Sequence, residues 1–242
     1  KAVVKTLYDS LKRTGHDFIS LEINESTKKE YEQELVEATA TFHLLEVVFS
    51  VSKTKMNPIA SLRESMGRRL PEEYFAELLA GWLVEDVIKL ELEKKGLEVE
   101  LTGVDRERKV LFKRTRNMGE YDLKVRTEQG CYYFEIQRVA PANISEVGEG
   151  EEKSICTQLK KHKYTRGNKP DKILILWIGE REIPSYLIFI PNPKQNENVC
   201  FRRDSSNKDA ICIEEHYSYK KTLCWKEFKK ISKEDLIKTF TE

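Results

Sequence analysis

Two short alternating segments, residues 121–127 and 131–138, constrain the fold of this chain more than any other feature. In both segments apolar residues alternate with polar ones. Strict alternation gives each segment one apolar and one polar face, which is the pattern of a half-buried β-strand. Residues 128–130 suit a tight turn between them, because Gly130 adopts positive φ without strain. The sequence therefore predicts a β-hairpin.

The register of this hairpin brings two acidic residues together. With residues 128–129 as the turn, counting outward places Asp122 opposite Glu135, and a one-residue bulge would move the pair only slightly. Directly opposed like charges destabilise a sheet, so something must offset their repulsion. A divalent cation does so, and Mg²⁺ is typically held by one or two carboxylates together with water and substrate phosphate. The backbone carbonyl of Ile136 is a candidate third ligand.

A solvated sheet face is the other interpretation of these two acids, with Lys124 and Arg126 as neutralising neighbours. The net charge of the chain is only +1, although 34% of its residues are charged. A nucleic-acid partner therefore requires positive charge that is concentrated locally. The candidate positions for such contacts are Lys113, Arg114, Arg116, Lys124, Lys160, Lys161, Lys163, Arg202 and Arg203. The alternative interpretation of all these residues is that they are ordinary solvated surface charges.

Helical patterns dominate the first part of the chain. Apolar residues recur at helical spacing over residues 1–14, and the pattern from Ser26 to about residue 52 is also helical. A short helix is expected at 59–68. A further helix begins with Pro71 in its first turn and ends at Gly96.

Strands prevail after this helix, with further helices interspersed. Residues 172–178 are apolar throughout, which is typical of a central strand covered on both sides. The remaining expected elements are extended segments at 97–101, 108–114 and 185–190, a basic helix at 153–164 and a final helix from Lys233. This order predicts an α/β (α+β) fold. The expected division is a helical region at 1–70, a core at 71–192 and a C-terminal extension packed on the core at 193–242.

The order of elements and acids resembles the PD-(D/E)xK nuclease superfamily, which has the restriction-endonuclease-like fold. In that family a helix Glu is followed by an Asp on the second strand and by (D/E)xK on the third. Asp122 matches the first motif acid and Glu135 the second, and Gln137 occupies the lysine position, giving an ExQ variant. Glu85 matches the helix acid, and Glu77, two helical turns earlier, is the alternative.

The resemblance covers roughly residues 72–190. It implies a mixed central sheet flanked by helices, and hydrolysis of DNA phosphodiester bonds by metal-activated water. Asp122 and Glu135, with the carbonyl of Ile136, would hold Mg²⁺, and Mn²⁺ would be a substitute. Glu85 would orient the nucleophile or bind a second ion through water.

Two positions depart from the family pattern. Tyr121 replaces the motif proline, which is a common change in this family. Gln137 replaces the lysine, and a neutral amide cannot supply the charge of an ammonium group. Gln137 would instead position water, and Lys124 or Lys160 would supply the cation.

Within the superfamily, the expected function is that of a type II restriction endonuclease acting on double-stranded DNA. The N-terminal helices, residues 1–70, would form a homodimer that matches a palindromic site or would contact the DNA. A junction-resolving or repair nuclease is the nearest alternative, and an inactive nuclease fold that binds nucleic acid is an alternative of another class. The five cysteines form no CxxC pair and no apolar segment approaches about 18 residues, so we expect an intracellular, prokaryotic-type cytoplasmic protein without a membrane partner.

Overall fold

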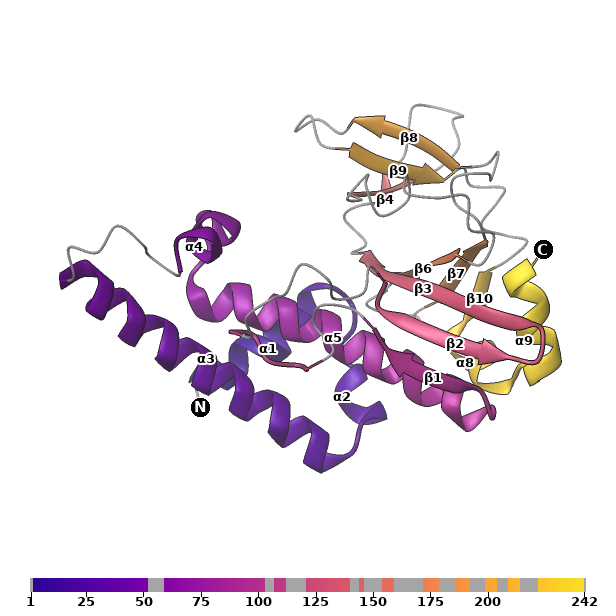
Figure 1. The fold of residues 1–242 in the computed structure, drawn as a ribbon, viewed down its shortest axis with the longest axis horizontal. Coiled ribbons are helices and arrows are strands. Elements are labelled where there is room, and N and C mark those ends of the chain that lie inside the picture. The colour runs from indigo at the N-terminus through magenta and orange to yellow at the C-terminus, as the bar shows by residue number, and fades with distance from the viewer. Residues whose placement is uncertain are drawn as a thin grey trace. The chain divides into compact units, whose positions relative to one another are not determined.

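The chain contains both helices and strands and divides into two compact units (Figure 1). The computed structural model describes residues 2–51, 59–102, 107–111, 121–139, 144–145, 154–158, 172–178, 186–191, 199–203, 209–213 and 222–241. Unit 1 comprises Lys1–Arg13, Asp17–Val87 and Glu107–Lys113, and unit 2 comprises Thr14–His16, Ile88–Arg106 and Arg114–Glu242. Among the helices of the described part, none is both long enough and apolar enough to span a membrane.

Unit 1 is helical, as the sequence predicts. Its elements are α1 (Ala2–Arg13), α2 (Ile19–Glu22), α3 (Glu25–Val51), α4 (Ala60–Met66) and the first part of α5 (Pro71–Lys94). Gly96, which the sequence predicts to end the helix that begins at Pro71, has a φ of 77°, and Gly15 after α1 has a φ of 73°. The rings of Phe42 and Phe75 meet edge to face at 5.7 Å in the core between α3 and α5. The division between the units falls inside α5, after Val87.

Unit 2 is built around a mixed six-stranded sheet, here called sheet A. Its strands, in spatial order, are β1 (Glu98–Leu101), β2 (Leu123–Thr127), β3 (Gly130–Val139), β6 (Lys172–Ile178), β7 (Tyr186–Pro191) and β10 (Thr222–Cys224). Strand β3 pairs antiparallel with β2 and parallel with β6. The apolar strand β6 lies between β3 and β7, so its predicted central position is confirmed.

The C-terminal helices α8 (Trp225–Lys230) and α9 (Lys233–Thr241) pack on one face of sheet A (Figure 1). The ring of Phe240 lies 5.0 Å from that of Phe134 on β3, and Trp225 lies 4.9 Å from Trp177 on β6. Because side chains alternate along a strand, Phe134 and Glu135 point to opposite faces of the sheet. The acidic positions of the hairpin therefore belong to the face away from these helices.

A second, four-stranded sheet, here called sheet B, contradicts one expectation. It consists of β4 (Ile144–Ser145), β5 (Ser154–Gln158), β9 (Asp209–Ile213) and β8 (Val199–Arg203), in that order. The helix expected at 153–164 is wrong for residues 154–158, which form β5. Ile155 and Thr157 are β-branched and pair with Ile213 and Ile211 on β9, so a long-range ladder outweighs the local pattern.

The strand expected at 108–114 is also wrong where the structure describes it. Residues 107–111 form turns, and Arg108 has a φ of 52°. Positive φ does not fit a strand and is uncommon for a residue other than glycine. The segment is held by side chains of α3 and α5 instead of by a ladder.

Candidate active site

The predicted register of the hairpin is confirmed over its regular part. Thr127 pairs with Gly130, and the ladder continues outward to the pair Leu123 and Phe134. Gly130 has a φ of 142°, which suits the tight turn that it closes. Sequence alternation therefore predicted both the strands and their alignment.

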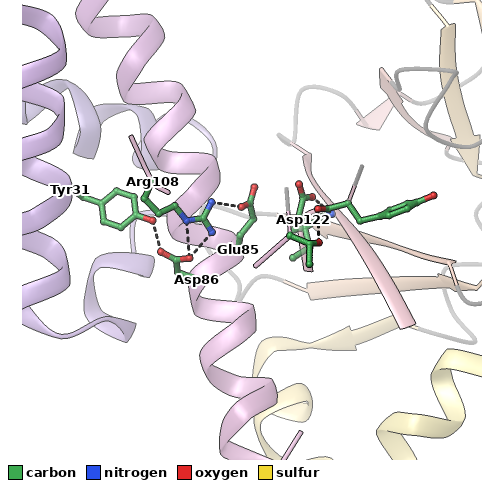
Figure 2. Close-up of polar contacts among 8 residues, drawn as sticks. Tyr31, Glu85, Asp86, Arg108 and Asp122 are labelled. Carbon is green, nitrogen blue, oxygen red and sulfur yellow. Dashed lines mark hydrogen bonds and ion pairs between the residues drawn. The ribbon is translucent and has the colours of Figure 1, made fainter. Parts of the chain in front are cut away.

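At Asp122 the ladder is interrupted (Figure 2). The amide of Asp122 donates to the carbonyl of Phe134 at 3.0 Å, although Leu123 is the register partner of Phe134. Two consecutive residues of one strand thus oppose one residue of the other, as in a β-bulge. The amide of Ile136 donates to Oδ2 of Asp122 at 2.7 Å, so a carboxylate receives a hydrogen bond at the point where the regular ladder ends.

Strand β1 fixes the backbone of Asp122 from the other side. The amide of Thr102, the residue after β1, donates to the carbonyl of Asp122 at 3.0 Å. The Oγ1 of Thr102 donates to the carbonyl of Tyr121 at 2.9 Å. Asp122 is therefore held between the ends of two strands, with its carboxylate positioned by a backbone amide.

Glu135 lies on β3 between the two residues that bond to Asp122. It is buried, with only 7% of its surface exposed. A carboxylate in such surroundings is costly unless polar groups or a cation compensate its charge. The two acids that the sequence placed together are therefore neighbours across the bulge, and one of them is largely withdrawn from water.

The oxygen atoms at this position suit a hard cation. In an antiparallel pair the amide and carbonyl of one residue face the same neighbouring strand. The Ile136 amide reaches Asp122, so the Ile136 carbonyl faces that side too. Two carboxylates and a carbonyl form an all-oxygen donor set of the kind that Mg²⁺ binds. Within the described residues, no three His, Cys, Asp or Glu side chains group around a common point for a metal ion.

Glu85, the predicted helix acid, belongs to a charged cluster in unit 1 (Figure 2). Nη1 of Arg108 lies 2.7 Å from Oε2 of Glu85, and Nη2 lies 2.6 Å from Oδ1 of Asp86. The hydroxyl of Tyr31 on α3 donates to the other carboxylate oxygen of Asp86. The guanidinium also lies over the ring of Trp82, 5.6 Å from its centre. Arg108 thus provides these two acids with a counter-charge from within the chain.

The electrostatics of this cluster favour its ionised and hydrogen-bonded form. Burial disfavours the charge on Arg108, but the nearby Glu85, Tyr31 and Asp86 outweigh it and raise the guanidinium pKa. Burial, together with the negative charge of Asp86, raises the pKa of Tyr31 well above its usual value. Tyr31 therefore keeps its proton and remains a donor to Asp86.

The same segment is anchored to α3 by Glu34. One carboxylate oxygen of Glu34 accepts the amide of Val110 at 2.7 Å, and the other lies 2.7 Å from Nζ of Lys109. This contact raises the pKa of Lys109. Residues 107–111 are thus fixed at two points, by Glu34 on α3 and by the acids of α5.

Glu77, the alternative helix acid, has a different environment on α5. Its two oxygens lie 2.5 Å from guanidinium nitrogens of Arg13 and Arg69. Sequence reasoning named both acids but did not find the arginines that pair with them. Arg13 lies 64 residues from Glu77 and Arg108 lies 23 from Glu85, and Arg69 precedes Glu77 by eight residues across a turn, so no helical spacing marks these pairings.

The candidate nucleic-acid contacts divide into three groups. Lys124 lies on β2, where its register partners are Glu100 and Tyr133. Arg202 and Arg203 are the last two residues of β8. Six further candidates lie outside the described residues: Lys113, Arg114, Arg116, Lys160, Lys161 and Lys163.

Comparison of the chain with protein-family models, with curated proteins and with solved structures finds no match. A functional assignment therefore depends on the geometry and chemistry of the residues described above. Among them, Asp122 has a carboxylate held by a backbone amide, and Glu135 on the adjoining strand is a buried acid.

Proposed function

We propose that this chain is a Mg²⁺-dependent endonuclease of the PD-(D/E)xK superfamily, a cytoplasmic enzyme that hydrolyses phosphodiester bonds of double-stranded DNA. Within that class we propose a sequence-specific type II restriction endonuclease that acts as a homodimer. The observation that carries the proposal is the carboxylate of Asp122 held by the Ile136 amide beside the buried Glu135.

The order of strands supports the superfamily. Asp122 directly precedes the second strand of sheet A, and the Glu135-x-Gln137 sequence lies on the third strand. The helix that carries Glu85 precedes both. The mixed sheet and its apolar central strand are consistent with a restriction-endonuclease-like core.

Each residue of the set has a role that the resemblance to the superfamily implies. Asp122 and Glu135, with the carbonyl of Ile136, would bind Mg²⁺, and Glu85 would orient the nucleophile. When bound, Mg²⁺ activates water and offsets the charge that develops on the phosphate. The backbone amide of Ile136 keeps the Asp122 carboxylate from turning away, so the ligand is oriented before the ion binds. Gln137 would position water through its amide.

Lys124 is the best placed described residue to supply the cation that Gln137 lacks. Its register partner on β3 is Tyr133, so Glu135 is its diagonal neighbour on the same face of the sheet. Diagonal neighbours in an antiparallel pair lie about 7–8 Å apart, within reach of a long side chain. The flexible stem of a lysine can therefore bring its ammonium group to the phosphate.

Digestion of supercoiled plasmid with Mg²⁺, with and without EDTA, tests the proposal. Asp122→Asn is the sharpest variant, because its amide oxygen still accepts from the Ile136 amide while the charge is lost. We expect cleavage to fall by about 1,000-fold, the effect of several kcal/mol of lost charge stabilisation. Glu135→Gln should reduce cleavage to a similar extent. Glu98→Gln, which alters an exposed acid of the same sheet, should cleave like wild type.

The products and the controls separate the alternatives. Discrete bands support a restriction endonuclease, and cleavage confined to branched DNA supports a junction-resolving or repair nuclease. Full cleavage by Asp122→Asn would contradict the proposed centre.

Gln137 favours one function of another class, a catalytically inactive nuclease fold that binds nucleic acid. Titration with Mn²⁺ distinguishes it from the enzyme. An enzyme should bind the ion at a site that Asp122→Asn and Glu135→Gln both weaken. DNA binding without such a site would favour the inactive module.

A further inference from the structure

Three of the five cysteines occupy one row across sheet B. Cys212 on β9 is the register partner of Cys156 on β5 and, on its other side, of Cys200 on β8. Register partners in an antiparallel pair lie on the same face of the sheet, with Cβ atoms about 4.5–5.5 Å apart. The three come from separate segments, so no CxxC spacing in the sequence marks this row.

The two cysteine pairs of the row both suit a disulfide. In an antiparallel ladder the amide and carbonyl of Cys212 face only one of its two neighbours. One pair is therefore hydrogen-bonded, with Cα atoms about 5.5 Å apart, and the other is not, with Cα atoms about 4.5 Å apart. Disulfides usually join Cα atoms that are about 4.4–6.8 Å apart, so each pair lies within the range.

The same row is poorly suited to a single metal ion held by all three thiols. Cys156 and Cys200 are separated by the width of two strand spacings, about 9–10 Å. A bond from zinc to a thiolate is about 2.3 Å long, so two sulfurs on one ion lie at most about 4.6 Å apart. The short side chain of cysteine does not cover the remainder. The geometry therefore favours reactions between two neighbouring thiols.

The cysteine row belongs to the more polar face of sheet B. Alternation places Gln158 and Arg202, two residues along their strands from Cys156 and Cys200, on the same face as the row. The positions beside the row belong to the other face, which is mostly apolar: Ile155, Ile211, Ile213, Val199 and Phe201. The polar face of an antiparallel sheet is commonly the solvated one, which a small oxidant in solution can reach.

We propose that Cys156, Cys212 and Cys200 form a redox-active thiol site, which a hydroperoxide oxidises to one exchangeable disulfide. The sulfur of one thiol attacks the O–O bond, becomes a sulfenic acid and releases an alcohol, or water from hydrogen peroxide, that takes up the thiol proton. The neighbouring thiol attacks this sulfur, so an S–S bond forms and water leaves. Two thiols thus lose two electrons, and these electrons reduce the peroxide.

The central position of Cys212 makes the disulfide exchangeable. Cys212 takes part in both possible disulfides, so only one of them exists at a time. When Cys212 is bonded to Cys156, the thiolate of Cys200 attacks the Cys212 sulfur, and Cys156 leaves as a thiolate. One S–S bond forms as another breaks, so the exchange consumes no oxidant. Transient disulfides of this kind are the ones found in reducing compartments.

Thiol counting and disulfide mapping on the full chain test this inference. The reduced chain is treated with hydrogen peroxide and denatured, its remaining thiols are titrated and alkylated, and trypsin digests it without reductant. Lysine and arginine residues separate the three cysteines, so each lies on its own tryptic peptide. We expect wild type to lose two of its five thiols first, with Cys212 linked to Cys156 or to Cys200. Cys131 and Cys224 on sheet A have no cysteine as a register partner and should remain thiols.

Serine variants distinguish the central cysteine from the outer two. Cys212→Ser removes the shared partner, so the disulfide should be lost. Cys156→Ser and Cys200→Ser should each still form a disulfide, because Cys212 keeps one cysteine neighbour. Cys131→Ser is the matched control from sheet A and should form the same disulfide as wild type.

Several results would overturn the inference. They are a wild type that keeps all five thiols while free glutathione in the same solution is oxidised, a disulfide to Cys131 or Cys224, and a Cys212→Ser variant that loses two thiols as fast as wild type. Thiols that react only after a chelator removes a bound metal would indicate a metal site instead.

The mapping of wild type gives the answer even if a serine variant does not fold, because the linked peptides identify the pair directly. Circular dichroism checks the fold of each variant. The measurement needs neither Mg²⁺ nor DNA, so failure of the proposed nuclease activity would leave this result unaffected.

Discussion

Two acidic pairs among the described residues are compensated in different ways. Glu85 and Asp86 in unit 1 share the guanidinium of Arg108, a cation that the chain itself supplies. In unit 2 the carboxylate of Asp122 is oriented by the neutral amide of Ile136, beside the buried Glu135. A backbone amide fixes the direction of a carboxylate but does not cancel its charge.

This difference suggests a structural role for Glu85 and Asp86 and a cation-binding role for Asp122 and Glu135. A carboxylate with a buried arginine partner contributes to the stability of the folded state, and breaking the pair leaves a charge without compensation. A carboxylate that a backbone amide orients beside a second acid is suited to bind a cation from solution. We therefore expect loss of Arg108 to act mainly on folding and loss of Asp122 to act mainly on cleavage.

The largest effect on stability should come from Arg108→Ala. It leaves Glu85 and Asp86 largely buried without their cation, and such losses cost about 3–5 kcal/mol. Urea unfolding measures the change. Arg126→Ala is the control, because Arg126 pairs with Glu98 at an exposed site, where the loss is below about 1 kcal/mol. If Arg108→Ala and Arg126→Ala lowered the free energy of unfolding equally, the Arg108 cluster would have no special role in stability.

The next largest effect on stability should come from breaking the contact between Glu34 and the segment 107–111. Glu34→Ala leaves the buried Val110 amide without its acceptor, at a cost of about 1–3 kcal/mol. Glu34→Gln keeps an oxygen for that amide and loses only the ion pair with the exposed Lys109, so it should cost less than about 1 kcal/mol. If the two variants unfold at the same urea concentration, the hydrogen bond to Val110 does not contribute to stability.

The helix acid can be identified by comparing two residues of α5. Glu85→Gln should lower the cleavage rate by about tenfold, which corresponds to roughly 1.4 kcal/mol. Glu77→Gln should leave the rate unchanged, since Glu77 lies eight residues before Glu85, about 12 Å away along α5, and pairs there with Arg13 and Arg69. Initial rates of plasmid linearisation at saturating Mg²⁺ provide the measurement. A reversed ranking would make Glu77 the helix acid.

The smallest effect concerns alkaline pH. Burial and Asp86 raise the folded-state pKa of Tyr31 above the unfolded value of about 10. The stabilisation from the neutral hydroxyl is therefore complete below about pH 10 and is lost as the pH rises toward the folded-state pKa. Between about pH 9 and 11, wild type should lose more stability than Tyr31→Phe. Parallel curves of unfolding free energy against pH would contradict this.

Local patterns predicted a large part of the fold. The helices of unit 1, the hairpin register and the central strand β6 all follow from periodicity and from glycine and proline positions. The strand β5 and the turns at 107–111 did not follow, because β5 depends on its pairing with β9 and the turns depend on Glu34. Both are long-range contacts that leave no periodic signal.

The sequence by itself determined which acids stand together on the hairpin. Alternation specifies the faces of two strands, and the turn specifies their alignment, so Asp122 and Glu135 had to be neighbours. Only the tertiary structure decided that Asp122 lies in a bulge with its carboxylate on the Ile136 amide, and that Glu85 faces Arg108. Those features depend on contacts between segments that are separate in the sequence. Such contacts form only when the chain packs, so no single segment encodes them.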